Sequence, residues 1–304
     1  MTHAMHHHDH SHGVSPDADR RRLAIALALI VGFMCVEVVV GIAAHSLALL
    51  SDAAHMLSDA GALALSLVAI ALARRPARGA MTYGLGRSEI LAAAINGSTL
   101  LVLGLFIVYE GIRRLIDPPD VEGAAVLVVA LAGVAVNLAA TLVLSGANRR
   151  SLNVEGAFQH ILTDLFAFIA TAVAGVVILA TGYTRADGIA ALLVAAIMLR
   201  AAYGLLRESG RVFLEASPRG LDPEVIGRRM AGEAGVAEVH DLHIWEVTSG
   251  FPALSAHVLV GTDTDCHDAR RALAQMLHDE FGIEHTTLQV EHEGAELLDI
   301  EVRP

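Results

Sequence analysis

Two histidine–aspartate pairs with the same spacing stand inside long apolar segments of this chain. His55 and Asp59 are four residues apart, and so are His160 and Asp164. Residues four apart lie on one face of an α-helix, so each pair offers a nitrogen and an oxygen ligand on the same side. An ionisable side chain in the middle of a membrane helix costs about 3 kcal/mol on insertion scales, and such residues are usually functional. The four residues are therefore a candidate metal site.

The donor set of these pairs predicts which metal they bind. Two imidazoles and two carboxylates suit Zn²⁺, which takes tetrahedral sites of nitrogen and oxygen ligands, whereas Mg²⁺ and Ca²⁺ prefer six or more oxygens. Co²⁺ and Cd²⁺ stay open as alternatives, because affinity order alone does not fix selectivity. Asp52, one turn before His55, is interpreted as adjacent to the site, with a spare ligand or a helix cap as alternatives. The alternative for all five side chains is that they only stabilise the packing of the helices, through hydrogen bonds between them.

Charge balance predicts how such a site fills and empties. Two neutral imidazoles and two carboxylates balance one divalent cation, and the empty site leaves two unpaired negative charges in a low dielectric. Burial then favours protonation when the metal leaves. A site that exchanges Zn²⁺ for one or two protons can run on a proton gradient, so we expect metal export coupled to H⁺ entry by alternating access, the work of a secondary active transporter and not of an enzyme.

Composition indicates that these pairs lie in a membrane domain. The chain has 304 residues, 54% of them hydrophobic, and a mean hydropathy of +0.55, well above a soluble domain. Apolar segments long enough to cross about 30 Å of hydrocarbon recur and then stop near residue 206. We expect six spans and an α-helical membrane bundle, at Leu23–Ala44, Leu47–Ala73, Ile90–Ile116, Val121–Ser145, Val154–Thr181 and Gly188–Leu206. With this topology the two pairs lie on antiparallel helices, and the His of one faces the Asp of the other.

Charge sets the orientation. Most arginines flanking the expected spans fall on one side, and basic residues in short loops favour the cytoplasm, so both termini are predicted to be cytoplasmic in a multi-pass inner-membrane protein. Residues 1–211 carry 15 acidic and 15 basic side chains, whereas residues 212–304 carry 18 and 6. The acidic C-terminal part repels nucleic acid and attracts cations.

Four polar residues lie in or beside the expected spans: Glu89, Asn96, Glu110 and Asn137. They are expected to make hydrogen bonds between helices, and the alternative is that they line the transport pathway.

Three regions follow from these patterns: a His-rich tail at 1–19, a six-helix membrane domain at 20–211 and a cytoplasmic domain at 212–304. In the last, Asp222 and Pro223 open a helix to about Ala234. Alternating runs predict strands at Val236–Val247, Ala253–Val260 and Thr286–Glu291, with a helix at Cys266–Phe281 between the second and third. The order αββαβ predicts a small α+β domain, one sheet face covered by two helices.

Several motifs together resemble the cation diffusion facilitator family. They are the run from Ser46 to Asp59 (SLALLSDAAHMLSD), the run from Tyr83 to Ile90 (YGLGRSEI), His160 with Asp164, and the run from Val239 to Trp245 (VHDLHIW). The likeness is to zinc exporters of the bacterial cobalt-zinc-cadmium resistance branch. It implies a homodimer, proton-coupled efflux and a ferredoxin-like cytoplasmic domain that binds regulatory metal.

The resemblance also points to a second site. His240, His257, Glu291 and His285, with His243 as a further candidate, fall on the expected strands where similar proteins hold metal near the dimer interface. The His-rich tail, with His3, His6, His7, His8, His10 and His12, is expected to gather Zn²⁺, and an expression tag is the alternative. A membrane-anchored divalent-metal sensor or carrier without transport remains the competing function, since it needs the cytoplasmic ligands but not Asp164.

Overall fold

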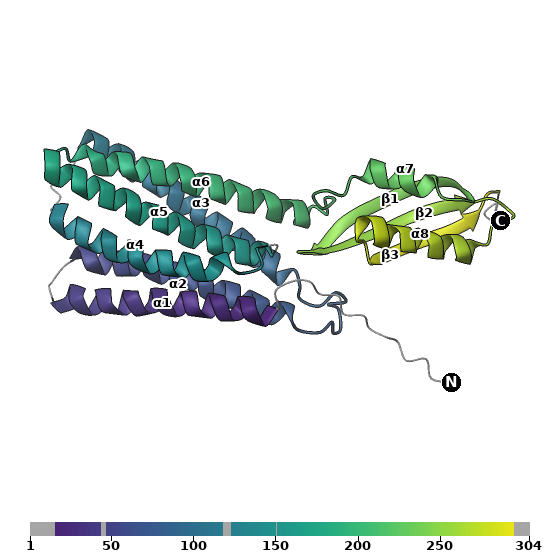
Figure 1. Cartoon of the computed structure of the whole chain (residues 1–304), viewed down its shortest axis with the longest axis horizontal. Coiled ribbons are helices and arrows are strands. Elements are labelled where there is room, and N and C mark those ends of the chain that lie inside the picture. Colours follow the sequence, from purple (N-terminus) through teal and green to yellow (C-terminus); the bar gives the residue numbers. More distant parts are fainter. Residues whose placement is uncertain (1–15, 44–46, 118–122, 150, 295–304) are drawn as a thin grey trace, which may run out of the picture. The chain divides into compact units, whose positions relative to one another are not determined.

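The chain divides into two compact units, Met1–Ser209 and Gly210–Pro304, in a computed structural model (Figure 1). The structure describes residues 16–43, 47–117, 123–149 and 151–294. The histidines of the tail that are predicted to gather zinc, at positions 3 to 12, lie outside the described residues.

Long helices build the N-terminal unit. Their bounds are α1 Pro16–Ala43, α2 Leu47–Ala73, α3 Ser88–Ile116, α4 Gly123–Ser145, α5 Leu152–Thr181 and α6 Arg185–Phe213. Each expected segment coincides with one of these helices. The largest differences are at α1, which begins at Pro16 instead of Leu23, and at α6, which ends at Phe213 instead of Leu206. Both helices continue through polar residues that no apolar count would include.

Four helical stretches in the described part of the chain are long and apolar enough to cross a membrane. They are Ser88–Ile116, Leu127–Ser145, Leu152–Thr181 and Gly188–Phe213, and Asp59–Ala73 forms a shorter apolar stretch. The N-terminal unit is thus a helical membrane domain with four clear apolar spans.

Apolar side chains from α1, α2, α4 and α5 form one buried cluster. Leu23 and Ile30 of α1, Leu63 of α2, Leu144 of α4 and Ile161 of α5 are at most 1% exposed and belong to it. Helix α3 packs on α2 and α5. Its glycines at 97, 104 and 111, seven residues apart, approach leucines of α6 so closely that an added Cβ at Gly104 would lie 2.9 Å from Leu199. Small residues at this spacing let two helices pack closely.

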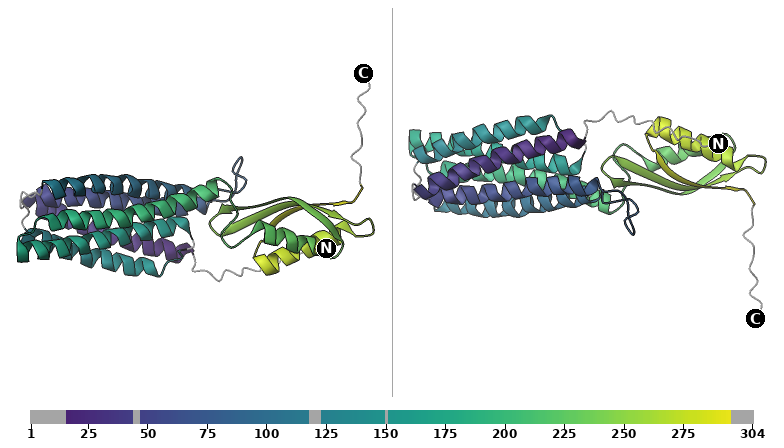
Figure 2. Two further views of the ribbon diagram at one scale, coloured as in Figure 1. Left: turned by 90° about the horizontal axis from the view of Figure 1, so that it is seen from above. Right: turned by 90° about the horizontal axis from the view of Figure 1, so that it is seen from below.

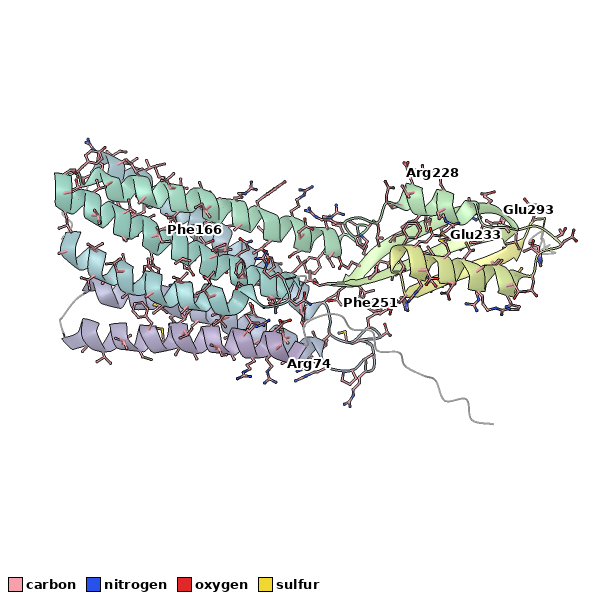
Figure 3. The ribbon with its side chains drawn as sticks, viewed as in Figure 1. Arg74, Phe166, Arg228, Glu233, Phe251 and Glu293 are labelled. Atoms are coloured by element: carbon pink, nitrogen blue, oxygen red, sulfur yellow. The ribbon has the colours of Figure 1, made fainter. Side chains whose placement is uncertain are left out.

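The C-terminal unit is a three-stranded sheet with two helices. Its elements are α7 Pro223–Ala231, β1 Val236–Thr248, β2 Phe251–Val260, α8 Cys266–Phe281 and β3 His285–His292. The order αββαβ is therefore confirmed, with α7 ending at Ala231 and the hairpin turn reduced to Ser249 and Gly250, whose φ of 77° suits a glycine. The turn lies beside Phe251 (Figure 3).

The sheet has the order β1-β2-β3, with β1 and β2 antiparallel and β2 and β3 parallel. Alternate residues of β2, Leu254, Ala256, Val258 and Val260, are buried against apolar residues of α7 and α8. Figure 2 shows both helices on the same side of the sheet. The opposite face of the sheet therefore carries the polar half of the alternation.

Both helices of this unit have capped N-termini. Asp222 accepts hydrogen bonds from the backbone of Glu224 and Val225, and Pro223 occupies the first helical position. Asp265 does the same for α8, where the backbone N–H groups of Asp268 and His267 hold the pKa of the Asp265 carboxyl below its usual range. Arg229 of α7 donates to both carboxylate oxygens of Glu280 on α8, which joins the two helices.

Candidate metal centre

Three of the four predicted membrane ligands come together between α2 and α5. Asp59, His160 and Asp164 offer ligand atoms that all lie within 4.8 Å of one another. His160 Nε2 lies 2.8 Å from Asp59 Oδ1, a hydrogen-bond distance, and 3.8 Å from Asp164 Oδ2. Two of these residues are one turn apart on α5, as the spacing predicted, and the third comes from α2.

The site is sealed from solvent. Asp59, His160 and Asp164 are 4%, 1% and 4% exposed, and the apolar neighbours Met56 and Ile161 belong to the buried cluster. Phe166, labelled in Figure 3, is 42% exposed, so α5 turns one face to the site and the other outward. Nδ1 of His160 has no hydrogen-bond partner among the described residues. Buried carboxylates and an imidazole at such distances are arranged to bind a cation or to share protons.

The distances describe a hydrogen-bonded site rather than a metal-bound one. Metal–ligand bonds of about 2.05 Å at tetrahedral angles place two ligand atoms about 3.3 Å apart. The contact from His160 to Asp59 is shorter than this and the one to Asp164 is longer. Side-chain movements of about half an ångström would adapt both contacts to a zinc ion.

The remaining predicted membrane residues, His55 and Asp52, lie on the helical backbone of α2, but their side chains fall outside the described residues. Position 55 can still be placed by register. The helices are antiparallel, with Asp59 opposite His160, and four residues back along α2 correspond to four residues forward along α5. By this register, position 55 of the α2 backbone falls opposite position 164 of α5.

On the sheet of the C-terminal unit, two of the predicted histidines are neighbours. His240 on β1 is the register partner of His257 on β2, and their ring centroids are 5.4 Å apart. Asp241 lies between the histidines of this face, with one carboxylate oxygen 2.9 Å from His243 Nε2 and the other 3.9 Å from His257 Nε2. All these side chains lie on the part of the sheet that α7 and α8 do not bury.

Asp241 is the residue that the sequence reasoning missed. Its φ of 52° is unusual for a residue other than glycine, and it coincides with a register irregularity between His240 and His243. A bulge of this kind puts two residues of β1 opposite one of β2, so His240 and His243 turn toward the same face. The only sequence signal was the run His-Asp-Leu-His. In a regular strand the two histidines of this run would point to opposite faces of the sheet, so the sequence does not predict that they lie together.

The other two predicted ligands of this domain lie further away. His285 is the partner of Ala253, four residues along β2 from His257 and thus about 13 Å away along the strand. Its ring contacts Phe251, with centroids 5.7 Å apart. Glu291 is the register partner of Leu259, which is two residues along β2 from His257, so Glu291 lies diagonally from His257. The Glu291 carboxylate accepts a hydrogen bond from Gln289. The structure thus groups His240 with His257 and separates His285 from them.

Comparison with known proteins gives matches over both units. Residues 23–214 match the model of the cation efflux transmembrane domain, and residues 218–293 match that of the cation efflux protein cytoplasmic domain. The "Metal cation efflux system protein CzcD" of Cupriavidus metallidurans is 40% identical, over 90% of this chain and 87% of that protein. The "Zinc transporter ZitB" of Escherichia coli is 40% identical, over 86% and 84% of the two chains.

A third relative, the "Cadmium, cobalt and zinc/H(+)-K(+) antiporter" of Bacillus subtilis, is 37% identical over 88% of this chain and 87% of its own length. Among solved structures, the metal-bound C-terminal domain of the CzcD transporter from Cupriavidus metallidurans is 38% identical, with a TM-score of 0.23. It covers 23% of this chain and 99% of that one.

Proposed function

The chain belongs to the cation efflux family, and from that premise we propose that it is a proton-coupled antiporter that exports Zn²⁺ from the cytoplasm, with Co²⁺ and Cd²⁺ as further substrates. The names of the relatives support this choice: one is called a zinc transporter and another a cadmium, cobalt and zinc/H⁺–K⁺ antiporter. The protein is thus a secondary active transporter, and the metal is its cargo.

The observation that carries the proposal is the buried cluster of Asp59, His160 and Asp164 between two antiparallel helices. With His55 as the fourth ligand, it supplies two nitrogens and two oxygens for a tetrahedral ion. Asp52 lies one turn further along α2, beside the site. A structural role alone would not require two carboxylates and an imidazole within 4.8 Å of one another away from water.

Proton coupling follows from the same contacts. Metal ligands must be deprotonated, so the arrival of Zn²⁺ releases the proton that His160 and Asp59 share at 2.8 Å. When the metal leaves on the far side of the membrane, a proton restores the hydrogen bond and screens the carboxylates. The cycle exchanges one metal ion for one or two protons, and alternating exposure of the cluster to the two sides moves them in opposite directions.

The finer architecture belongs to the same proposal. Helices α1 to α6 all span the inner membrane, with both termini in the cytoplasm, and residues 20–211 form the transport domain. Residues 212–304 form a ferredoxin-like cytoplasmic domain through which two copies of the chain make a homodimer, preceded at 1–19 by the His-rich tail. The support is the match to the family's transmembrane and cytoplasmic domains together with the side on which the arginines lie.

A regulatory metal site in the cytoplasmic domain completes the proposal. His240 and His257 form its centre, because their rings are adjacent on the uncovered face of the sheet. Asp241 supplies a carboxylate ligand there. Glu291 of β3 completes the ligand set when its side chain turns toward the two histidines. His285 lies too far along the strand to bind the same ion within one chain.

Zinc uptake into everted membrane vesicles tests the transport function. Vesicles that contain the wild-type chain should accumulate Zn²⁺ when their interior is acidic, and the rate should fall when the pH gradient is collapsed. His160→Ala and Asp164→Ala should abolish uptake, because each removes a ligand. Equal uptake with and without the gradient would disprove proton exchange. Uptake unaffected by both substitutions would disprove the assignment of the transport site to these residues. Absence of uptake by the wild-type chain, with zinc still bound, would instead favour a sensor or carrier that binds metal in its cytoplasmic domain.

A further inference from the structure

Helices α2 and α5 share a second buried polar contact that the metal site does not use. The side-chain amide Nδ2 of Asn153 donates to the main-chain oxygen of Ser66 at 2.9 Å, and both residues are 0% exposed. The Ser66 hydroxyl donates to the carbonyl of Ala62 in its own helix and accepts a 3.4 Å hydrogen bond from Asn96 on α3. Oδ1 of Asn153 has no hydrogen-bond partner among the described residues.

This contact follows the same register as the metal site. Seven residues forward along α2 lead from Asp59 to Ser66, and seven residues back along α5 lead from His160 to Asn153. Seven residues are close to two helical turns, so both contacts lie on the same faces of the two helices, about 10 Å apart. The helices therefore meet through one polar contact at the site and another two turns away.

From this register we infer that Asn153 is a positioning residue that sets the metal selectivity of the transport site. The inference rests on the proposed function. Asn153 does not reach the metal ligands. Its amide instead fixes the axial position of α5 relative to α2, and that position determines how far the His160 and Asp164 ligand atoms lie from Asp59. Between these helices the Asn153 bond is buried and neutral, so it holds the register in both the metal-bound and the protonated state.

The distances show why a small shift matters. A tetrahedral zinc ion needs ligand atoms about 3.3 Å apart. The contact between the two helices, from His160 to Asp59, is 2.8 Å and changes with their register, whereas the 3.8 Å contact from His160 to Asp164 lies within α5 and does not. One residue of axial slip moves a helix by about 1.5 Å, several times the adjustment that zinc requires. Looser packing of α5 against α2 widens the metal site, and a wider site favours Cd²⁺, the larger ion, over Zn²⁺.

The identity of the donor gives a sharp test. Asn153→Asp keeps the shape but loses the N–H that reaches Ser66, and Asn153→Ala removes the contact without adding a charge. Ser66→Ala is the matched control: it leaves the main-chain acceptor of Asn153 in place and removes only the hydroxyl that Asn96 contacts. The control therefore disturbs the same polar cluster while it preserves the bond between α2 and α5.

The experiment measures initial rates of Zn²⁺ and of Cd²⁺ uptake into proteoliposomes containing the full chain, under one pH gradient, and takes their ratio. The ratio does not depend on how much of each variant folds. We expect wild type and Ser66→Ala to share one ratio, and the two Asn153 variants to shift it about tenfold toward Cd²⁺. This takes the lower end of the loss in metal affinity that follows removal of a residue orienting a metal ligand as the loss for Zn²⁺ alone. If Asn153→Asp does not fold, Asn153→Ala carries the test.

Two results would overturn the inference. An unchanged ratio in both Asn153 variants, even with lower rates for both metals, would leave Asn153 with a packing role only. An equal shift in Ser66→Ala would assign the effect to the cluster as a whole and not to the bond between α2 and α5. Absence of uptake by the wild-type chain for both metals is a different outcome, since it contradicts the proposed function itself.

Discussion

Replacement of Asp59 by asparagine is the most direct test of the charge balance at the metal centre. Asparagine has nearly the same shape, so packing around the 4% exposed side chain should survive. What changes is the charge, because one carboxylate fewer leaves a bound divalent ion only partly neutralised. The contact with His160 Nε2 at 2.8 Å also loses its ionic acceptor.

The size of the effect can be worked out from the geometry. The ligand atoms lie within 4.8 Å of one another, so an ion bound among them lies nearer than 4 Å to each carboxylate. A pair of unit charges 4 Å apart in an effective dielectric of 20 interacts by about 4 kcal/mol. The metal carries two charges, and the cost of removing it from water offsets part of the gain. We therefore take about 4 kcal/mol as the loss, which corresponds to about a thousandfold weaker zinc binding.

Zinc uptake by proteoliposomes, at zinc concentrations well below saturation, checks this value. Asp59→Asn should reduce the rate about a thousandfold, to background. Asp279→Asn is the control, because this exposed aspartate on α8 lies in the other unit, and its uptake should equal that of the wild type. A correctly folded Asp59→Asn protein that transports zinc at more than about a tenth of the wild-type rate would refute the charge-balance argument.

Three further predictions concern the C-terminal unit. His240→Ala combined with His257→Ala should remove one bound zinc per chain in isothermal titration, whereas His285→Ala, about 13 Å away along the sheet, should leave the stoichiometry unchanged. Asp222→Ala should destabilise this unit by about 1 kcal/mol through loss of the α7 cap, measured by chemical denaturation, with Asp222→Asn as the conservative control. The folded pKa of Asp265 is lowered by backbone hydrogen bonds, so its stabilising contribution is present above the unfolded pKa and is lost as pH falls through the folded value. Melting curves at decreasing pH should therefore show a smaller acid destabilisation for Asp265→Ala than for the wild type, and equal slopes would contradict this reading.

The local parts of the structure could be predicted from the sequence because their causes are local. Four-residue spacing puts His160 and Asp164 on one helical face wherever the helix is placed. Long apolar runs predicted helices α3 to α6, and Asp222 followed by Pro223 marked where α7 begins. The helix predicted at Cys266–Phe281 is also confirmed, with Leu273 and Leu277 buried.

The polar residues of the spans were predictable only in part. Asn96 does bond across helices, to Ser66, as expected. Asn137 instead donates to the carbonyl of Gly133 in its own helix, and Glu110 pairs with Arg113 and Arg114 one turn away. Side-chain polarity alone does not say whether the nearest partner lies in the same helix or in the next one, because both can satisfy a buried amide. Asn153 was not singled out, since no repeated spacing marks it.

The repeated His-x-x-x-Asp spacing by itself determined which residue types face a common side, and the donor chemistry determined that a zinc-like ion suits them. Only the tertiary structure decided that Asp59 meets His160 at 2.8 Å and that Ser66 and Asn153 hold the same register. It also decided that the strand register pairs His240 with His257 and leaves His285 apart, and that a bulge at Asp241 turns His243 to the face of His240. The physical reason is the range of the interactions. Helical faces follow from hydrogen bonds four residues apart, whereas the register between two helices or two strands depends on side chains about a hundred or about twenty residues apart, and no local pattern encodes it.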